Sequence, residues 1–198
     1  MRYPEIFDYS DKGKWRKTYL RKELRSKEWD LMIQEPIDDV LEVPFFTEEF
    51  CDKFIENLKD MEFTPIDKWG TDVEVVHPED IDFFGIMKDL IDEFGVEIGG
   101  YKWHLHGDNW HDMDVNSHIN KLEVGQQIRL HHDFVSLTQL IMLEDNGETM
   151  KVVFPKYDSG VEPKKGHLYL FPGQITHRYG IRMVKETPKY FITNYCLG

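Results

Sequence analysis

Cysteine is scarce in this chain, and long apolar runs are absent. The 198 residues include only Cys51 and Cys196, which excludes a disulfide scaffold and a zinc site built from cysteines. No apolar run approaches the about 18 residues of a membrane-spanning helix, and residues 1–30 lack the apolar segment of a secretory signal. We therefore expect no membrane segment and no signal peptide, and a reducing, intracellular environment.

Basic residues are in the minority. Lys and Arg number 24 against 37 Asp and Glu, which gives a net charge of -13. Nucleic-acid binding requires clustered positive charge, so this balance argues against a nucleic-acid partner and is compatible with a basic peptide or a metal ion. The acidic excess lies in residues 36–98, whereas residues 1–27 are basic and residues 99–198 are balanced.

The two halves of the chain have different patterns. Apolar residues make up 40% of the sequence, which is enough for the core of one domain. The first half predicts a basic amphipathic helix over 12–28, a strand over 40–46, a helix capped by Thr47, and a helix that begins at Pro78 and stops at Gly95. From residue 99 onward, turn residues separate short strand-like runs at 116–124, 135–143, 150–154, 167–171 and 189–196.

Helices followed by many short strands predict helices packed outside a β-sandwich or barrel. We expect a single domain over 1–198. In it, residues 1–98 form a helical support region and residues 99–198 form the β core that carries the functional site.

Two of the nine histidines stand in a pattern that suits a metal ion. His131 and Asp133 are two residues apart in an extended segment, so both side chains project from one face, while His132 points away. His177 follows the strand expected at 167–171 and is the candidate third ligand. Two histidines and one carboxylate on one face of an iron ion leave positions open for a substrate and dioxygen.

A His-x-Asp tripeptide is a weak signal on its own, and the chain has a second one at His106-Gly107-Asp108. The first is favoured by its context, because an apolar strand, a Gly-Glu-Thr turn, another strand and His177 follow it. A polar, acidic loop follows the second tripeptide. We therefore place the candidate metal centre at His131 and Asp133.

The order of these motifs resembles the iron(II)- and 2-oxoglutarate-dependent dioxygenases of the prolyl and lysyl hydroxylase type. Within that family the chain is most similar to the catalytic domain of procollagen-lysine hydroxylases, over residues 38–198. The resemblance depends on His131-His132-Asp133 with Thr138 five residues further on, and on a later series of motifs. These are Lys165-Gly166, Pro172-Gly173 and Thr176-His177, preceded upstream by the Pro- and Phe-rich stretch 43–51.

The resemblance implies a set of cofactors. His131, Asp133 and His177 would hold Fe(II), and 2-oxoglutarate would chelate the iron as a cosubstrate beside O2. Ascorbate is the expected reductant.

The resemblance also implies a cosubstrate pocket. A basic residue on the last core strand would meet the distal carboxylate of 2-oxoglutarate, and Lys189 stands at the matching position, with Lys185 and Arg182 as rivals. The inward-facing residues after the metal motif would line this pocket, or else belong only to the sheet core; they are Thr138, Leu140 and Met142.

The chain departs from the family at several of these positions. Leu122 stands where a tyrosine often contacts 2-oxoglutarate, and Leu140 stands where lysyl hydroxylases have asparagine. Lys189 replaces the arginine that is usual in lysyl hydroxylases. The lysine ammonium is a point charge, whereas the arginine guanidinium can bind a carboxylate through two parallel hydrogen bonds. We therefore expect a cosubstrate pocket that differs in part from the family's.

Taken with the charge, the resemblance implies a fold and a function. The fold is mainly β with flanking helices, a double-stranded β-helix or jelly roll. The function is hydroxylation of a side chain, lysine rather than proline, in a basic peptide or protein substrate, and a homodimer is compatible with it. Two alternatives stay open: a prolyl 4-hydroxylase-like or small-molecule oxygenase of the same superfamily, and a non-catalytic, cupin-like binding domain.

The segment between the two halves is a candidate substrate-binding loop. It shows neither helical nor strand periodicity and is rich in aromatic residues and carboxylates. Asp112 and Asp114 could attract a lysine ammonium, and Trp103 or Trp110 could pack on its methylene stem. The alternative is a solvated loop whose tryptophans cover the core.

Overall fold

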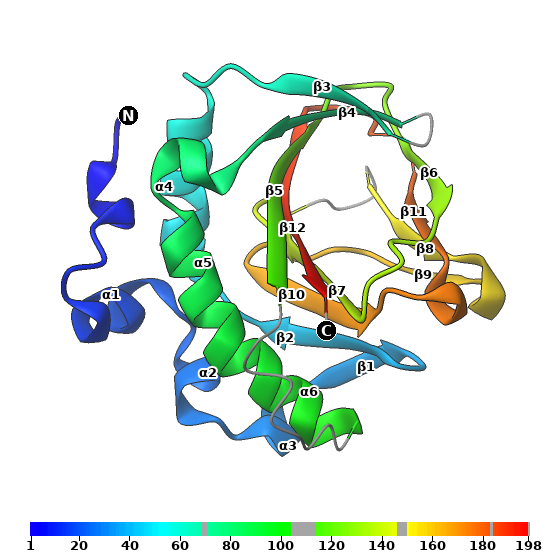
Figure 1. Ribbon diagram of the computed structural model, residues 1–198, viewed down its shortest axis with the longest axis horizontal. Coiled ribbons are helices and arrows are strands. Elements are labelled where there is room, and N and C mark those ends of the chain that lie inside the picture. The colour runs from blue at the N-terminus through cyan, green and yellow to red at the C-terminus, as the bar shows by residue number, and fades with distance from the viewer. Residues whose placement is uncertain (69–70, 104–113, 146–149, 183, 198) are drawn as a thin grey trace.

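The computed structural model describes residues 1–68, 71–103, 114–145, 150–182 and 184–197. Within these ranges the strands form two sheets (Figure 1). The larger sheet contains β1 (Gln34–Ile37), β2 (Val40–Pro44), β3 (Thr64–Lys68), β4 (Thr71–Val76), β5 (Asp114–Leu122), β7 (Leu137–Met142), β10 (His167–Pro172) and β12 (Lys189–Leu197). The smaller contains β6 (Ile128–His131), β8 (Val152–Phe154), β9 (Ser159–Val161) and β11 (Tyr179–Ile181).

The chain winds back and forth between the sheets. The strand orders are β1-β2-β10-β7-β12-β5-β4-β3 and β6-β11-β8-β9. From β5 to β12 the chain alternates between the larger and the smaller sheet, except that the consecutive strands β8 and β9 pair within the smaller one. Neighbouring strands pair antiparallel in both. This is a double-stranded β-helix, or jelly roll. The expected fold class is therefore confirmed.

The helices cover one side of the larger sheet (Figure 1). The α-helices are α1 (Lys12–Tyr19), α2 (Lys22–Ser26), α3 (Trp29–Met32), α4 (Glu48–Leu58), α5 (Phe84–Leu90) and α6 (Val96–Trp103). Short 3-10 helices span Pro4–Phe7, Pro78–Ile81, Pro155–Tyr157 and Ile175–His177, and a π-helix spans Ile91–Gly95. None of the described helices is long and apolar enough to cross a membrane.

The larger sheet separates two hydrophobic cores, because successive strand residues point to opposite faces. On its outer face, Ile141 of β7 and Ile192 of β12 pack with Phe54 and Leu90 from the helices. On its inner face, neighbouring residues of the same strands pack against the smaller sheet. This inner core includes Leu140, Met142, Phe171, Phe191, Phe154 and Ile181.

Two helix predictions were wrong in detail. The expected helix over 12–28 is interrupted at Leu20, whose extended backbone forms an isolated bridge with Phe46, so α1 and α2 are separate helices. Gly95 does not stop the helix that precedes it. A π-helical turn carries the chain past Gly95 into α6.

The first 98 residues supply more than helices. Besides the strand expected at 40–46, they contribute β1, β3 and β4 to the larger sheet, where β4 pairs with β5 and β2 pairs with β10. These strands were missed because a short run such as Gln34–Ile37 is mostly exposed and has no clear alternation.

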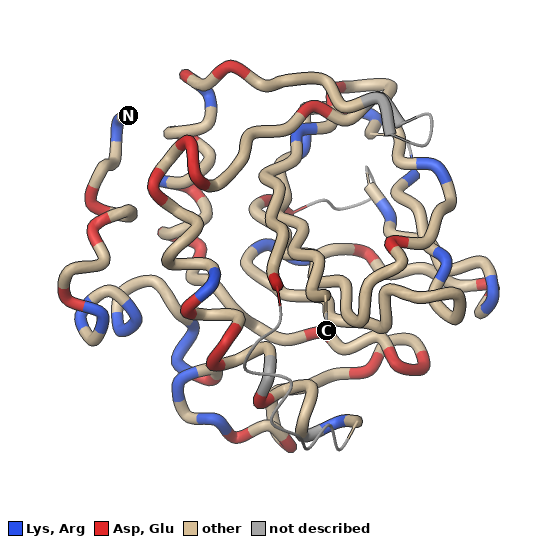
Figure 2. Tube along the Cα trace, viewed as in Figure 1, with Lys and Arg blue, Asp and Glu red and all other residues tan. Residues whose placement is uncertain are grey.

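The basic N-terminal segment finds its counter-charges within the chain. Figure 2 shows Lys and Arg along α1 beside acidic residues of α5 and the helical turns after it. Arg16 lies 2.7 Å from Asp89 and 2.6 Å from Glu93, and Lys27 lies 2.6 Å from Glu97. Four-residue spacing places the three carboxylates on one face of the α5–α6 helical stretch. Some of the basic residues of the N-terminal segment thus form ion pairs that hold α1 and α2 against α5 and α6.

The Lys-Gly turn before β10 requires glycine. Gly166 has φ +73°, its N–H donates to Met142 at 2.7 Å, and its carbonyl accepts from Phe45 and Phe46. An added Cβ would lie 2.3 Å from the Phe46 carbonyl oxygen.

We expect Gly166→Ala to lower the free energy of unfolding by about 2 kcal/mol or more, because left-handed backbone strain adds to a clash with backbone. Urea denaturation followed by circular dichroism measures this. Gly125→Ala is the matched control, since φ there is +90° but nothing lies within 4 Å of the new Cβ. Equal losses in the two variants would show that the close packing around Gly166 contributes nothing.

Candidate metal centre

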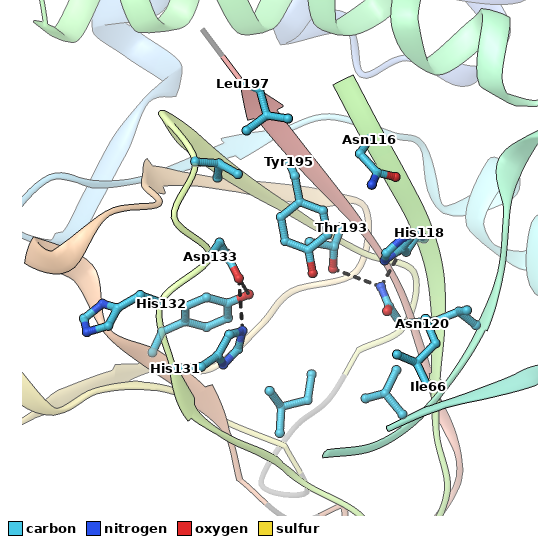
Figure 3. A pocket seen from close by; sticks show the side chains of 15 residues that line it. Ile66, Asn116, His118, Asn120, His131, His132, Asp133, Thr193, Tyr195 and Leu197 are labelled. Atoms are coloured by element: carbon cyan, nitrogen blue, oxygen red, sulfur yellow. Dashed lines mark hydrogen bonds and ion pairs between the residues drawn. The ribbon is translucent and has the colours of Figure 1, made fainter. Parts of the chain in front are cut away.

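A cavity of about 240 Å³ opens between the two sheets. One wall carries the His-x-Asp motif at the end of β6, and the other is made by inward-facing residues of β5 and β12 (Figure 3). The polar lining residues are Asn116, His118, Asn120, His131, His132, Asp133, Tyr179, Thr193 and Tyr195.

His131 and Asp133 meet at this cavity. The Nε2 atom of His131 lies 3.0 Å from Oδ1 of Asp133, and the Asp133 side chain is only 2% exposed. Outer contacts hold both groups: the Thr138 hydroxyl donates to Oδ2 of Asp133 at 2.5 Å, and Nδ1–H of His131 donates to the Arg129 carbonyl at 2.8 Å. Nε2 of His131 and Oδ1 of Asp133 thus face each other at the edge of the cavity. The His132 ring points away from the pair (Figure 3).

Burial and the neighbouring negative charge shift the pKa of His131 in opposite directions. Burial by itself disfavours the charged imidazole, but the hydrogen bond to Asp133 and the charge of its carboxylate outweigh this and raise the pKa of His131. A metal ion that binds at Nε2 must displace the proton that this pairing retains.

Tyr179 completes the cluster from the neighbouring strand. In the antiparallel pairing of β11 with β6, Tyr179 stands directly opposite His131. Its ring centroid is 4.7 Å from that of His131, and its hydroxyl lies 3.5 Å from Oδ1 of Asp133. The residue is 2% exposed, and burial, with the nearby Asp133 charge, raises the pKa of its phenol well above 10. The sequence analysis did not identify Tyr179.

His177 does not join this cluster. It closes the 3-10 helix Ile175–His177 instead of extending β11, so the strand rule of alternating faces does not apply to it. The residue is 2% exposed and lines no part of the cavity. Its Nε2 lies 3.1 Å from the Asp38 carbonyl oxygen and 3.1 Å from the Tyr157 hydroxyl.

The donor set therefore fits a 2-His-1-carboxylate iron site only in part. His131 and Asp133 occupy two positions, but within the described ranges no three His, Cys, Asp or Glu side chains are arranged to hold a metal ion. In the structure His177 lies outside this pair, with Nε2 near Asp38 and Tyr157, and its role as third ligand stays a prediction. The third group beside the pair is the phenol of Tyr179.

Lys189 lies away from the cavity. It opens β12 on the same face as Thr193 and Tyr195, which line the cavity. However, Thr193 is four residues further along, about 13 Å at strand spacing, and the buried Phe191 lies between them. The Lys189 ammonium is 3.8 Å from Glu144 in a separate depression beside α4. Burial raises the pKa of Glu144, although Lys189 opposes the shift.

The other expected pocket residues face inward. Thr138 is fully buried and contacts Asp133, whereas Leu140 and Met142 belong to the inner core. They lie deeper than the cavity, which they do not line.

A polar wall faces the His131–Asp133 pair across the cavity. Asn120 of β5 donates from Nδ2 to the Thr193 hydroxyl at 2.9 Å, and the His118 ring lies 5.5 Å from the Tyr195 ring, edge to face. These side chains were missed, although Asn116, His118 and Asn120 alternate along one strand and so share a face. Polar residues on the inner face of a buried strand are the signal that could have identified them.

Of the proposed substrate residues, two are described. Trp103 ends α6 and donates from Nε1 to Asp39 at 2.8 Å while its ring packs against the outer core. Asp114 is exposed at the start of β5. Trp110 and Asp112 lie outside the described residues, as does the second tripeptide His106-Gly107-Asp108.

Comparisons with known proteins agree with the fold and with the resemblance. The chain is 22% identical over 207 residues to human procollagen-lysine,2-oxoglutarate 5-dioxygenase 2, with 91% of the chain and 26% of that protein covered, and the mouse protein matches equally. The chain thus spans about a quarter of the length of these relatives. No protein-family model matches it.

Solved structures match over most of the chain. The viral collagen prolyl hydroxylase of Paramecium Bursaria Chlorella virus-1 gives a TM-score of 0.61 at 15% identity, covering 81% of this chain and 96% of its own. A Pseudomonas putida prolyl-4-hydroxylase gives 0.60 at 12% identity, covering 80% and 92%. The fold is that of 2-oxoglutarate- and Fe(II)-dependent oxygenases, and the resemblance to hydroxylases of the prolyl and lysyl type is confirmed.

Proposed function

We propose that this chain is a 2-oxoglutarate-dependent dioxygenase domain that hydroxylates a side chain of a peptide or protein. The observation that carries the proposal is the His131–Asp133 pair, which lies inside a double-stranded β-helix at a cavity large enough for a small cosubstrate. Iron, 2-oxoglutarate and O2 are the cofactors of this proposal, with ascorbate as reductant. Bound iron would supply the activation of O2.

The chain's own residues hold the reacting groups in place. Thr138 fixes the orientation of the Asp133 carboxylate, and the Arg129 carbonyl fixes the Nδ1–H tautomer of His131. Such outer contacts typically change metal affinity or activity by about 10–100-fold. The polar wall of Asn120, Thr193 and His118 offers partners for one carboxylate of a cosubstrate, and Lys189, at the start of β12, remains our candidate for its distal carboxylate.

We propose lysine as the preferred target and a basic peptide as the substrate. The relatives matched by sequence act on procollagen lysine according to their names, and the net charge of -13 favours a cationic partner. Asp114, with Trp110 and Asp112, remains our candidate for contacting such a substrate. We also propose a reducing, intracellular location, because both cysteines are buried free thiols.

A second candidate function is a binding domain without turnover. The observation in its favour is the separation of His177 from the His131–Asp133 pair. Such a domain would bind a ligand in the cavity without consuming 2-oxoglutarate.

Succinate formation separates the two candidates. We expect purified protein with Fe(II), 2-oxoglutarate and ascorbate to form succinate, and lysine-containing basic peptides to stimulate this above proline-containing peptides of equal charge. Hydroxylated peptide is measured by mass spectrometry. Stimulation by the proline peptide alone would replace lysine with proline as the target. Binding of 2-oxoglutarate without any succinate would favour the binding domain.

A further inference from the structure

We propose that the outer face of the smaller sheet carries a second binding site, a basic groove that takes an extended, acidic peptide segment of a protein partner. The groove has a volume of about 780 Å³, and Figure 2 shows Lys and Arg along the strands of this sheet. The proposal goes beyond the proposed function, since it involves neither a metal ion nor turnover. The basic residues that line the groove are Arg129, Lys151, Arg178 and Arg182.

Strand alternation separates the basic groove from the cavity between the sheets. In β8, Val152 and Phe154 belong to the inner core, so Lys151 and Val153 project outward. The same rule applies to β11, because its first and last residues belong to the inner core and the exposed arginines that flank it project outward. The groove thus lies on the face that the sheet turns to solvent.

Two glycines hollow the middle of the basic groove. Val153 pairs with Gly180 of β11 on one side and with Gly160 of β9 on the other, so it supplies the single side chain of this row. A Cβ added at Gly180 would lie 2.8 Å from the Ile128 carbonyl oxygen, and a larger residue therefore does not fit there without a backbone shift. Leu130, which is 39% exposed, extends the apolar floor.

The charges of the basic groove are not balanced within the chain. Among its described lining residues, Asp158 is the only carboxylate beside four cations. Arg16 of α1, in contrast, forms ion pairs with Asp89 and Glu93, whereas no carboxylate in the described part of the chain forms one with a cation of the groove. Because the whole chain carries a net charge of -13, this positive charge is a local feature, and it favours an anionic partner.

The spacing of the cations suits an extended peptide better than a single small anion. Arg178 and Arg182 flank β11 and are four residues apart, about 13 Å at strand spacing. The Arg182 N–H donates to the Lys151 carbonyl at 2.9 Å, which places these two residues at one end of the groove. At the other end, the Arg178 guanidinium donates to the Leu130 carbonyl at 3.2 Å. A lone phosphate cannot reach both ends, but residues i and i+4 of an extended peptide can.

Isothermal titration calorimetry with the whole protein tests the proposal. The probe is the acetylated and amidated peptide Glu-Glu-Leu-Glu-Glu, whose leucine matches the apolar floor and whose glutamates match the two basic ends. We expect one-to-one binding at low ionic strength and at least tenfold weaker binding in about 1 M salt, where charges are screened over about 3 Å. The peptide Gln-Gln-Leu-Gln-Gln should not bind. No binding of the acidic peptide, or equal binding of both peptides, would overturn the proposal.

Paired substitutions locate the binding. Lys151→Ala combined with Arg182→Ala removes both cations from one end of the groove and should weaken binding of the acidic peptide at least tenfold. Lys22→Ala combined with Arg25→Ala is the matched control, because it removes the same two residue types from exposed positions on α2, and it should leave the affinity unchanged. Equal affinities in the two double variants would place the peptide elsewhere and contradict the proposal.

A single substitution at the opposite end gives an independent measurement. Arg178→Ala should weaken binding of the acidic peptide at least threefold, and circular dichroism shows whether each variant keeps the wild-type fold. Wild-type affinity in a folded Arg178→Ala variant would contradict a peptide that spans the groove.

Two other occupants would give different results. A short oligothymidylate that binds more tightly than the acidic peptide would make the basic groove a nucleic-acid site and overturn the assignment. Sedimentation velocity tests for a second copy of the chain, whose acidic residues could also enter the groove. A dimer that the Lys151→Ala, Arg182→Ala variant abolishes would replace the peptide with that second copy. We expect neither result.

Discussion

Asp133→Ala should abolish succinate formation and weaken metal binding by at least about 100-fold. The carboxylate is the central donor of the cluster, since both His131 and Tyr179 contact its Oδ1 atom. Even outer contacts to metal ligands contribute about 10–100-fold, so the loss of a ligand must cost at least as much. Anaerobic Fe(II) titration measures the affinity, and the succinate assay measures the activity.

Two further variants make this result specific. Thr138→Val removes the hydroxyl that donates to Oδ2 of Asp133 but keeps the side-chain volume, and should reduce metal affinity by about tenfold. Asp52→Ala removes a carboxylate on the surface of α4 whose side chain is 65% exposed, and should change neither property. Near-normal metal affinity in Asp133→Ala would move the centre away from the His-x-Asp motif altogether.

The positions that could be predicted from the sequence are those governed by local rules. The two-residue spacing of His131 and Asp133 places both at one cavity, because adjacent extended residues alternate faces. Thr47 accepts from the Phe50 N–H at the start of α4, as expected of an N-cap. Each of these outcomes depends on fewer than five residues of chain.

The positions that could not be predicted depend on pairing between distant segments. Tyr179 reaches the site only because β11 pairs with β6 in one register, and a shift of one residue would turn its ring to the other face. His177 ends a 3-10 turn just before β11, so the direction of its ring depends on that turn and not on strand alternation. Lys189 was placed by resemblance alone, and the buried Phe191 separates it from the cavity.

Phe50→Ala should lower the free energy of unfolding by about 3–5 kcal/mol, which is typical for a buried phenylalanine. Phe50 is fully buried and connects α4 to three other parts of the fold. Its ring stacks on Phe46 at 4.1 Å, contacts Trp15 of α1 at 5.7 Å and lies 5.9 Å from Phe83 ahead of α5. Removing the ring opens a cavity that these three rings, held by different elements, cannot all close.

Measuring both the stability and the metal affinity of this variant shows whether the helices contribute to the site. Domains of this size are stable by about 5–15 kcal/mol, so the variant should show a much lower urea midpoint at an unchanged slope. Glu49→Ala, at the neighbouring position with its side chain 56% exposed, should cost no more than about 0.5 kcal/mol. If Phe50→Ala also weakens metal binding at temperatures where it stays folded, the helical layer must help to hold the larger sheet in the register that positions Thr138 and Asp133. Unchanged metal affinity would mean that the two sheets preserve the centre without it.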